Sequence, residues 1–113
     1  MSNTYPKKAA AAGEVRISEN VIRSIAGVSA KEIEGVADLA SVRTTLLRTE
    51  PPVSVQIVRD TVEITVRLVL KNGCRLTGVA EQVQQKIKEN VQSMTGVIVS
   101  KVHVIAADIM FEE

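Results

Sequence analysis

The stretch from Thr61 to Leu70 constrains the fold most, because apolar residues occupy every second position and alternate with polar ones from Thr61 to Leu68. Successive side chains of a β-strand point to opposite faces, so this alternation predicts a strand with one dry face and one wet face. The dry row is Val62, Ile64, Val66, Leu68 and Leu70, and the wet row is Thr61, Glu63, Thr65 and Arg67. We interpret this stretch as the central strand of an antiparallel sheet that carries helices on one side.

Two other stretches have the periodicity of amphipathic helices. The first is predicted at Glu19 to Lys31, with Ser18 as its N-cap. The second has Thr77 as its predicted cap, and Gly96 stands where a left-handed C-terminal cap is expected. Its apolar stripe consists of Leu76, Val79, Ala80, Val83, Ile87, Val91 and Met94. Gly27 either weakens the first helix or lets that helix approach the sheet closely, and the sequence leaves both interpretations open.

Shorter patterns predict the remaining elements. Strands are expected at Val15–Ile17, Val53–Ile57 and Val97–Ala107, where apolar residues alternate with polar ones. Arg59-Asp60 is a plausible tight link into the central strand. Between residues 33 and 46 apolar residues recur at three- and four-residue steps, which predicts a turn at Glu34-Gly35 followed by a short helix.

The predicted order is strand, helix, strand, strand, helix, strand, with an extra segment before the hairpin. This order resembles a ferredoxin-like arrangement. Because the strands alternate and each main helix has one apolar stripe, we predict an α+β fold, a two-layer sandwich with the helices packed mainly on one face of an antiparallel sheet. Residues 1–12 are expected to form a flexible N-terminal arm, and residues 13–113 a single domain.

Composition argues against several classes of function. Aromatic residues make up only 2% of the 113 residues, which disfavours single-stranded nucleic acid stacking on the surface. Fourteen Lys and Arg against thirteen Asp and Glu leave a net charge of +1, too small for long-range attraction to a polyanion. No apolar run approaches the roughly eighteen residues of a membrane span, and a chain with the single Cys74 fits a reducing cytoplasm.

No pattern in the sequence encodes a reaction. Cys74 stands just before a predicted helix N-terminus, which can lower a thiol pKa, but an inert thiol that is simply a small buried hydrophobe is the more common outcome. His103 is the only histidine and alternates with core residues, so a surface position is favoured over metal binding. The carboxylates show no paired-acid pattern, and no glycine-rich phosphate loop is present. We therefore expect no catalytic residues, no cofactor and no metal site.

The wet face of the sheet is the candidate interaction surface. We expect it to gather Glu63, Thr65, Arg67, Lys101, His103 and Ile105. In a two-layer fold this face is uncovered, and an ordinary solvated antiparallel face explains it as well as a protein-binding or self-association surface does. Both interpretations remain open at this point.

Several segments together resemble a known family. The pattern opens at Gly13-Glu-Val-Arg-Ile-Ser18 and Val21-Ile-Arg-Ser-Ile-Ala26, and continues through Glu32-Ile-Glu-Gly-Val36, Val62-Glu-Ile-Thr-Val66 and Asn72-Gly73. It ends with Val83-Gln-Gln-Lys-Ile-Lys88, Thr95-Gly96-Val97 and Val102-His-Val104. The chain from Gly13 to about Phe111 thus resembles the alkaline shock protein and general stress protein family of Gram-positive bacteria, the cell-envelope stress response family.

The resemblance implies a small cytoplasmic protein with no enzymatic activity, which acts as a scaffold in the envelope stress response through protein contacts. It implies protein partners, among them a membrane-anchored member of the same family or further copies of the chain, which would place the protein at the membrane periphery without inserting it. No nucleic-acid partner is expected. The alternative function is a small RNA-binding or regulatory domain, for example a regulator of lipid synthesis, and it rests on fold analogy.

Overall fold

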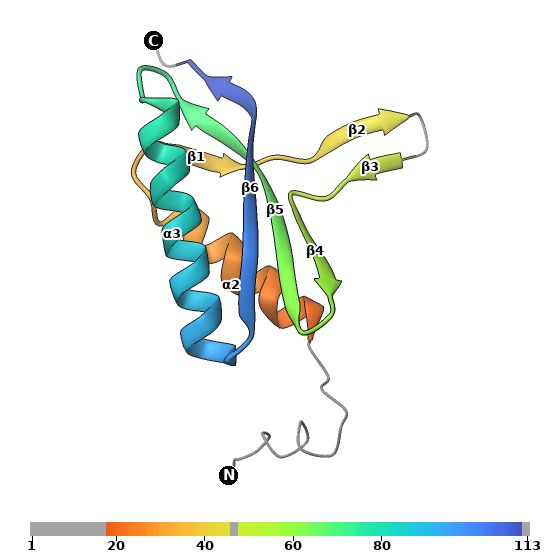
Figure 1. Cartoon of the computed structure of the whole chain (residues 1–113). Helices are drawn as coiled ribbons and strands as arrows, with labels where there is room; N and C mark the ends of the chain where they lie inside the picture. The colour runs from red at the N-terminus through yellow and green to blue at the C-terminus, as the bar shows by residue number, and fades with distance from the viewer. Residues whose placement is uncertain (1–17, 46–47, 112–113) are drawn as a thin grey trace.

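The computed structural model describes residues 18–45 and 48–111, and these form two layers, a sheet with helices against one of its faces (Figure 1). The elements in chain order are α2 (Glu19–Lys31), β1 (Val36–Leu39), β2 (Val42–Thr45), β3 (Arg48–Glu50), β4 (Val53–Val58), β5 (Thr61–Lys71), α3 (Leu76–Thr95) and β6 (Ile98–Met110). The α+β class and the two-layer arrangement are confirmed. The predicted arm at 1–12 and the predicted strand Val15–Ile17 lie outside the described residues.

Strand β5 is the centre of the sheet, as its alternation predicted. Strand β4 pairs antiparallel with the first part of β5, and β1 pairs antiparallel with its last part. Strand β6 pairs with the whole length of β5 on the other side, and this pairing is parallel. The sheet is therefore antiparallel only at β1 and β4, because α3 carries the chain back to the starting end of β5 before β6 begins.

Both main helices form where periodicity and end signals predicted them. Helix α2 spans Glu19–Lys31, and the Ser18 side chain accepts a hydrogen bond from the Val21 backbone N–H at 3.3 Å. Helix α3 ends at Gly96, whose φ of 80° is left-handed and whose N–H donates to the Gln92 carbonyl oxygen at 2.9 Å. The predicted Thr77 cap is wrong, since the N-cap of α3 is Arg75 and its side chain makes no capping bond.

The short helix predicted between residues 33 and 46 is wrong. After a turn at Glu34-Gly35 the chain forms strands β1 and β2 instead. Val36 faces Leu70 and Leu39 faces Leu68, so β1 continues the row that β4 begins along β5. The backbone groups of β5 beyond β4 need hydrogen-bond partners, and this tertiary requirement overrides the ambiguous apolar spacing. Strands β2 and β3 pair with each other and project from the body (Figure 1).

The core lies between β5 and the two helices. Every dry-row residue of β5 is at most 3% exposed, and the helices contribute matching buried positions. These positions are Ile22, Ala26 and Ala30 on α2, and Val79, Val83, Ile87 and Val91 on α3. Leu76 and Met94, both predicted in the α3 stripe, are 51% and 67% exposed because they lie at the two ends of the helix. The opposite face of the sheet has no helix over it among the residues described here (Figure 1).

Candidate interaction face on the open side of the sheet

The register of β5 and β6 brings the six predicted surface residues together. The pairs of opposed residues are Glu63 with Lys101, Thr65 with His103, and Arg67 with Ile105. All six lie on the face turned away from the helices, because the alternate residues of β5 are buried against α2 and α3. We call this set, with Ser54 and Gln56 of β4 beside it, the open face.

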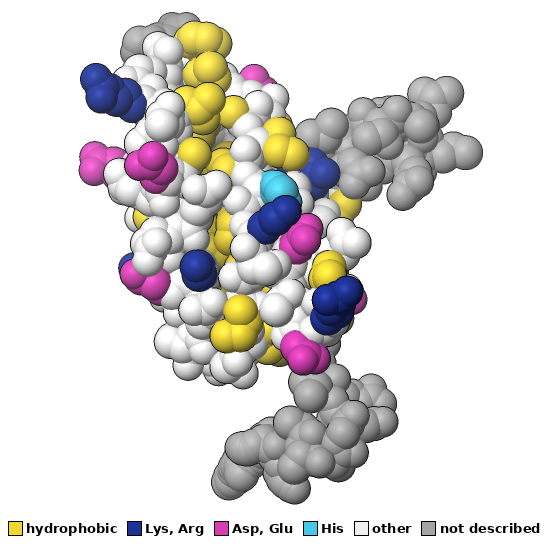
Figure 2. All heavy atoms as spheres, viewed as in Figure 1, with side chains coloured by type: hydrophobic (Ala, Val, Ile, Leu, Met, Phe, Trp, Pro, Cys, Tyr) yellow, Lys and Arg dark blue, Asp and Glu magenta, His cyan; other side chains and the backbone are white. Residues whose placement is uncertain are grey.

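The open face carries mixed charge together with apolar side chains. His103 Nε2 lies 3.8 Å from Glu63 Oε1, and Lys101 is the residue opposite Glu63. Ile105 is 42% exposed on the same face. In Figure 2 the single histidine sits among a basic and an acidic side chain in the middle of the visible surface. Such an exposed contact, which is an ion pair only when the imidazole is protonated, stabilises a fold by at most about 1 kcal/mol. The charges therefore contribute little to folding stability.

Arg67 has a structural role that the alternation alone did not reveal. Its Nη1 donates to the Pro51 carbonyl oxygen at 2.9 Å and lies 3.4 Å from Ser54 Oγ. Its backbone N–H donates to the Pro52 carbonyl oxygen at 2.8 Å. These bonds hold the start of β4 against β5, so Arg67 lies on the open face as a tethered side chain. The sequence held no signal for this, because the contact joins residues far apart in the chain.

Two bulges in β6 extend the open face beyond the predicted residues. Ser100 and Ala107 are the extra residues where the β5–β6 register shifts, and the Ser100 hydroxyl donates to the Val62 carbonyl oxygen at 3.2 Å. After each bulge, the residues lie on the opposite face of the sheet from the one that strict alternation would give them. Register therefore adds Ile98, Asp108 and Met110 to the open face, opposite Thr61, Val69 and Lys71. Strict alternation from Lys101 misses these positions, because a bulge leaves no clear mark in the sequence.

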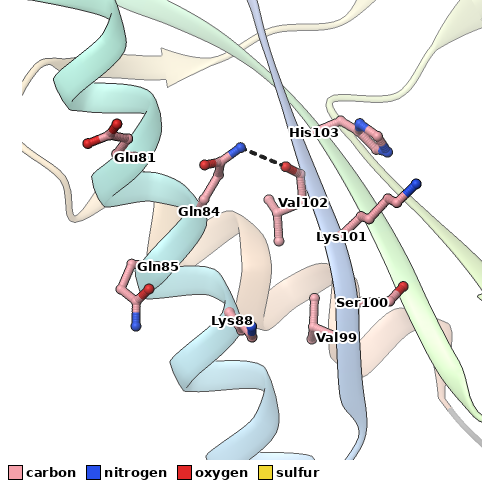
Figure 3. A pocket seen from close by; sticks show the side chains of 9 residues that line it. All are labelled: Glu81, Gln84, Gln85, Lys88, Val99, Ser100, Lys101, Val102 and His103. Carbon is pink, nitrogen blue, oxygen red and sulfur yellow. Dashed lines mark hydrogen bonds between the residues drawn. The ribbon is translucent and has the colours of Figure 1, made fainter.

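A furrow of about 490 Å³ lies between α3 and β6 (Figure 3). The helix side is polar, and across the furrow the Gln84 side-chain amide donates to the Val102 carbonyl oxygen at 2.9 Å. Figure 3 shows the Lys101 and His103 side chains extending away from α3. The polar groups along the furrow thus do not converge on one point, and its inner wall is the strand itself.

The residues considered for chemistry are not brought together. Cys74 is half-buried and packs against the core at the start of α3, whereas His103 lies on the open face. Within residues 18–45 and 48–111, no three His, Cys, Asp or Glu side chains are grouped so that they could hold a metal ion. Neither α2 nor α3, the helices of that same part, is long and apolar enough to cross a membrane.

Comparisons with known proteins cover most of the chain. The model of the alkaline shock protein 23 family, described as having a cell envelope-related function, matches residues 7–111. An uncharacterised protein of Streptococcus pyogenes is 29% identical over 106 residues, which are 86% of this chain and 88% of that protein. The uncharacterised protein YqhY of Bacillus subtilis is 28% identical over 107 residues, which are 88% of this chain and 79% of that protein. No solved structure matches significantly.

Proposed function

This chain belongs to the alkaline shock protein 23 family, whose described function is cell envelope-related, and we propose that it serves the envelope as a non-enzymatic scaffold. In this proposal it binds other proteins through the open face, at the inner periphery of the membrane, where a membrane-anchored member of the same family is the expected partner. The observation that carries the proposal is the open face itself, a sheet surface without a helix over it among the described residues.

The chemistry of the open face supports a protein partner. Charged side chains of both signs surround exposed apolar ones, which is the usual composition of a protein interface with a polar rim. The face also lies on the central strand, whose other side is at most 3% exposed. The backbone beneath the contact residues is therefore held rigidly, and a rigid surface loses little conformational entropy on binding.

Affinity purification from the native cell, with membranes retained, tests the proposal. Glu63→Lys reverses a charge in the middle of the open face, and we expect the partner captured by the wild-type chain to be lost or reduced about tenfold. Glu89→Lys makes the same charge change on the exposed surface of α3 and should leave capture unchanged. Thermal unfolding of both variants checks that they are folded. Equal capture by the two variants would refute an interface on the open face.

Complementation, under envelope stress, of a strain that lacks this chain addresses the absence of enzymatic activity in the proposal. Cys74 is the one candidate nucleophile that the sequence offered, and the proposal gives its thiol no chemical role. Cys74→Ser is nearly isosteric, so it should retain both partner capture and the envelope phenotype of the wild-type chain. Loss of the phenotype with capture intact would instead indicate chemistry at the thiol.

A further inference from the structure

The outer edge of β6 is open in its middle, around Val104 and Ala106, while groups nearer its two ends are bonded within the chain. Among the residues that the structure describes, this 13-residue strand pairs only with β5. The Val99 N–H donates to the Gln92 side-chain oxygen at 3.1 Å, and the Val102 carbonyl oxygen accepts from Gln84. Both glutamines come from α3 and bond the first half of β6, and towards the other end of the strand the Ile109 N–H donates to an Asp108 carboxylate oxygen at 2.8 Å. A long edge strand with apolar residues is a template for pairing with another strand unless it is covered or charged.

The helix layer also stops short of β6. Of its helix-facing residues, Val99 is 2% exposed, but Val102 and Val104 are only half-buried and Ile109 is 46% exposed. Ala106, on the same side, is exposed. Figure 2 shows this as apolar side chains visible in the hollow beside α3 and towards the end of the strand. The dry side of β6 thus extends beyond the helices that cover β5.

The hydrogen bond from Gln84 fixes which backbone groups point outwards. The Val102 carbonyl oxygen faces α3 rather than β5. In a strand, the N–H and C=O groups of every second residue point towards the same edge, in the plane of the sheet. Val104 and Ala106 therefore present their N–H and C=O groups to the outer edge, as Val102 does.

We propose that this outer edge pairs antiparallel with β6 of a second copy, about a twofold axis at Val104. The inference rests on the proposed function, which requires protein contacts, and it names one partner and its register. About this axis Val104 opposes its own symmetry mate, which makes a pair that can exchange both backbone hydrogen bonds. The helix-facing side then matches Val102 with Ala106 and Val99 with Ile109. Every pair on this side is apolar.

The open-face side of the same register is also complementary. His103 opposes Ile105, Ile98 opposes Met110, and Lys101 comes opposite Asp108. The bulges at Ser100 and Ala107 lie on opposite sides of Val104, so facing side chains stay in phase along the strands. Backbone pairing is confined to the stretch from Val102 to Ala106, because the Val99 and Ile109 N–H groups are already bonded within the chain. The one pairing of charged residues between the two β6 strands, Lys101 with Asp108 of the other copy, joins opposite charges. This match between the strand and its own reverse favours a second copy over an unrelated segment.

Pairing at this edge would join two open faces into one continuous surface. Each copy contributes its own set of contact residues around the twofold axis, so a partner with two binding segments could engage both. Such bivalent binding raises the overall affinity without any new contact. The scaffold of the proposed function would then be a dimer.

Light scattering after size-exclusion chromatography, over a series of protein concentrations, tests the pairing. The wild-type chain should approach twice the monomer mass as concentration rises. Ala106→Lys places a charge opposite Val102 of the partner strand on an exposed site, and it should weaken association more than about tenfold. Ser24→Lys adds the same charge to an exposed position on α2 and should leave the dimer unchanged. A strictly monomeric wild-type chain, or a dimer indifferent to Ala106→Lys, would overturn the proposal.

Charge exchange provides a sharper test of the register. Lys101→Asp and Asp108→Lys each create two like-charged contacts in their own dimers, so each variant alone should associate about tenfold more weakly. An equimolar mixture of the two variants restores both opposite-charge contacts and should form the mixed dimer preferentially. A mixture that stays as weakly associated as its components would overturn the assigned pairing.

These outcomes are separable from the proposed function. Glu63→Lys changes β5, which does not lie at the outer edge, so partner capture and dimer mass can be lost independently. A monomeric chain whose capture still depends on Glu63 would refute the β6 dimer alone. A dimeric chain whose capture does not depend on Glu63 would refute the open face as the site of the scaffold.

Discussion

Gly35 is the position where one added methyl group has the clearest consequence. Its φ is +106°, a conformation that side chains rarely adopt, and it lies in the turn that leads from α2 into β1. A Cβ built on it would lie 2.7 Å from Val79 Cγ2 of α3. Gly35→Ala therefore combines backbone strain with a steric clash in the core.

Gly73 separates these two effects. Its φ is +91°, similar to that of Gly35, but a Cβ there would meet no atom within 4 Å. Gly73→Ala should destabilise the fold by backbone strain alone, about 1–3 kcal/mol. Gly35→Ala adds an overpacking cost of about 1–3 kcal/mol, because Val79 is 6% exposed and has little room to move. Any stabilisation through a stiffer unfolded chain is common to both variants and cancels in the comparison.

Urea unfolding followed by circular dichroism, at one protein concentration, measures the free energies of unfolding. A double-mutant cycle with Val79→Ala completes the test. The cavity left by Val79→Ala costs about 2 kcal/mol by itself, but it also removes the clashing atoms. The double variant should thus be more stable than the sum of the single effects predicts. The argument fails if Gly35→Ala and Gly73→Ala differ by less than about 0.5 kcal/mol, or if the cycle shows no coupling.

Three further measurements follow from the structure. Ser29 is 1% exposed, and its hydroxyl accepts from the Asn90 side-chain amide at 2.7 Å, so Ser29→Ala should lower the free energy of unfolding in urea by about 1–3 kcal/mol. Asn90→Ala should cost less, because the Ser29 hydroxyl keeps its hydrogen bond to the Ile25 carbonyl oxygen at 2.7 Å. Gly27→Ala should change the free energy of unfolding, measured by thermal unfolding, by less than about 1 kcal/mol. The gain in helix propensity is opposed only by a tight contact of the added methyl group with Leu39 Cδ1 at 3.3 Å, the end of a side chain that can move. Filter binding across a salt series should detect no RNA binding that weakens steeply with salt, and detection of such binding would favour the alternative regulatory function.

The elements that sequence reasoning predicted well are those specified by neighbours in the chain. Helix α2 begins after the capping hydroxyl of Ser18, and α3 ends where Gly96 adopts a left-handed conformation. Strand β5 is buried on every second residue, as its alternation required. Caps, helical periodicity and strand alternation each act within a few residues, so the local sequence contains the whole signal.

Gly27 illustrates a choice that the sequence posed and packing resolved. From the sequence, Gly27 could either weaken α2 or allow α2 to approach the sheet closely. The residue is buried, and Leu39 of β1 and Val53 of β4 lie 3.3 and 3.8 Å from the place a Cβ would occupy. Close approach of the helix to the sheet is thus the reason that a small residue fits here.

The sequence could predict the open face wherever alternate residues of a strand share one face without interruption. Glu63, Thr65 and Arg67 share one side of β5, and Lys101, His103 and Ile105 share one side of β6. The residues beyond the bulges of β6 were not predicted, because one extra residue exchanges the two faces. The 3.8 Å approach of His103 to Glu63 also needed the register between two strands that the sequence separates by a whole helix.

Periodicity and capping residues thus specify which segments of this chain become helix or strand and which side of each faces inwards, since those properties depend on side chains a few positions apart. The direction of β6 beside β5, the strands found at residues 36–45 where a helix was expected, and the open middle of the outer edge of β6 come from contacts between distant segments. Such contacts are selected by the backbone hydrogen bonds and apolar area that the assembled sheet still has to satisfy, and no local pattern in a single segment carries that requirement.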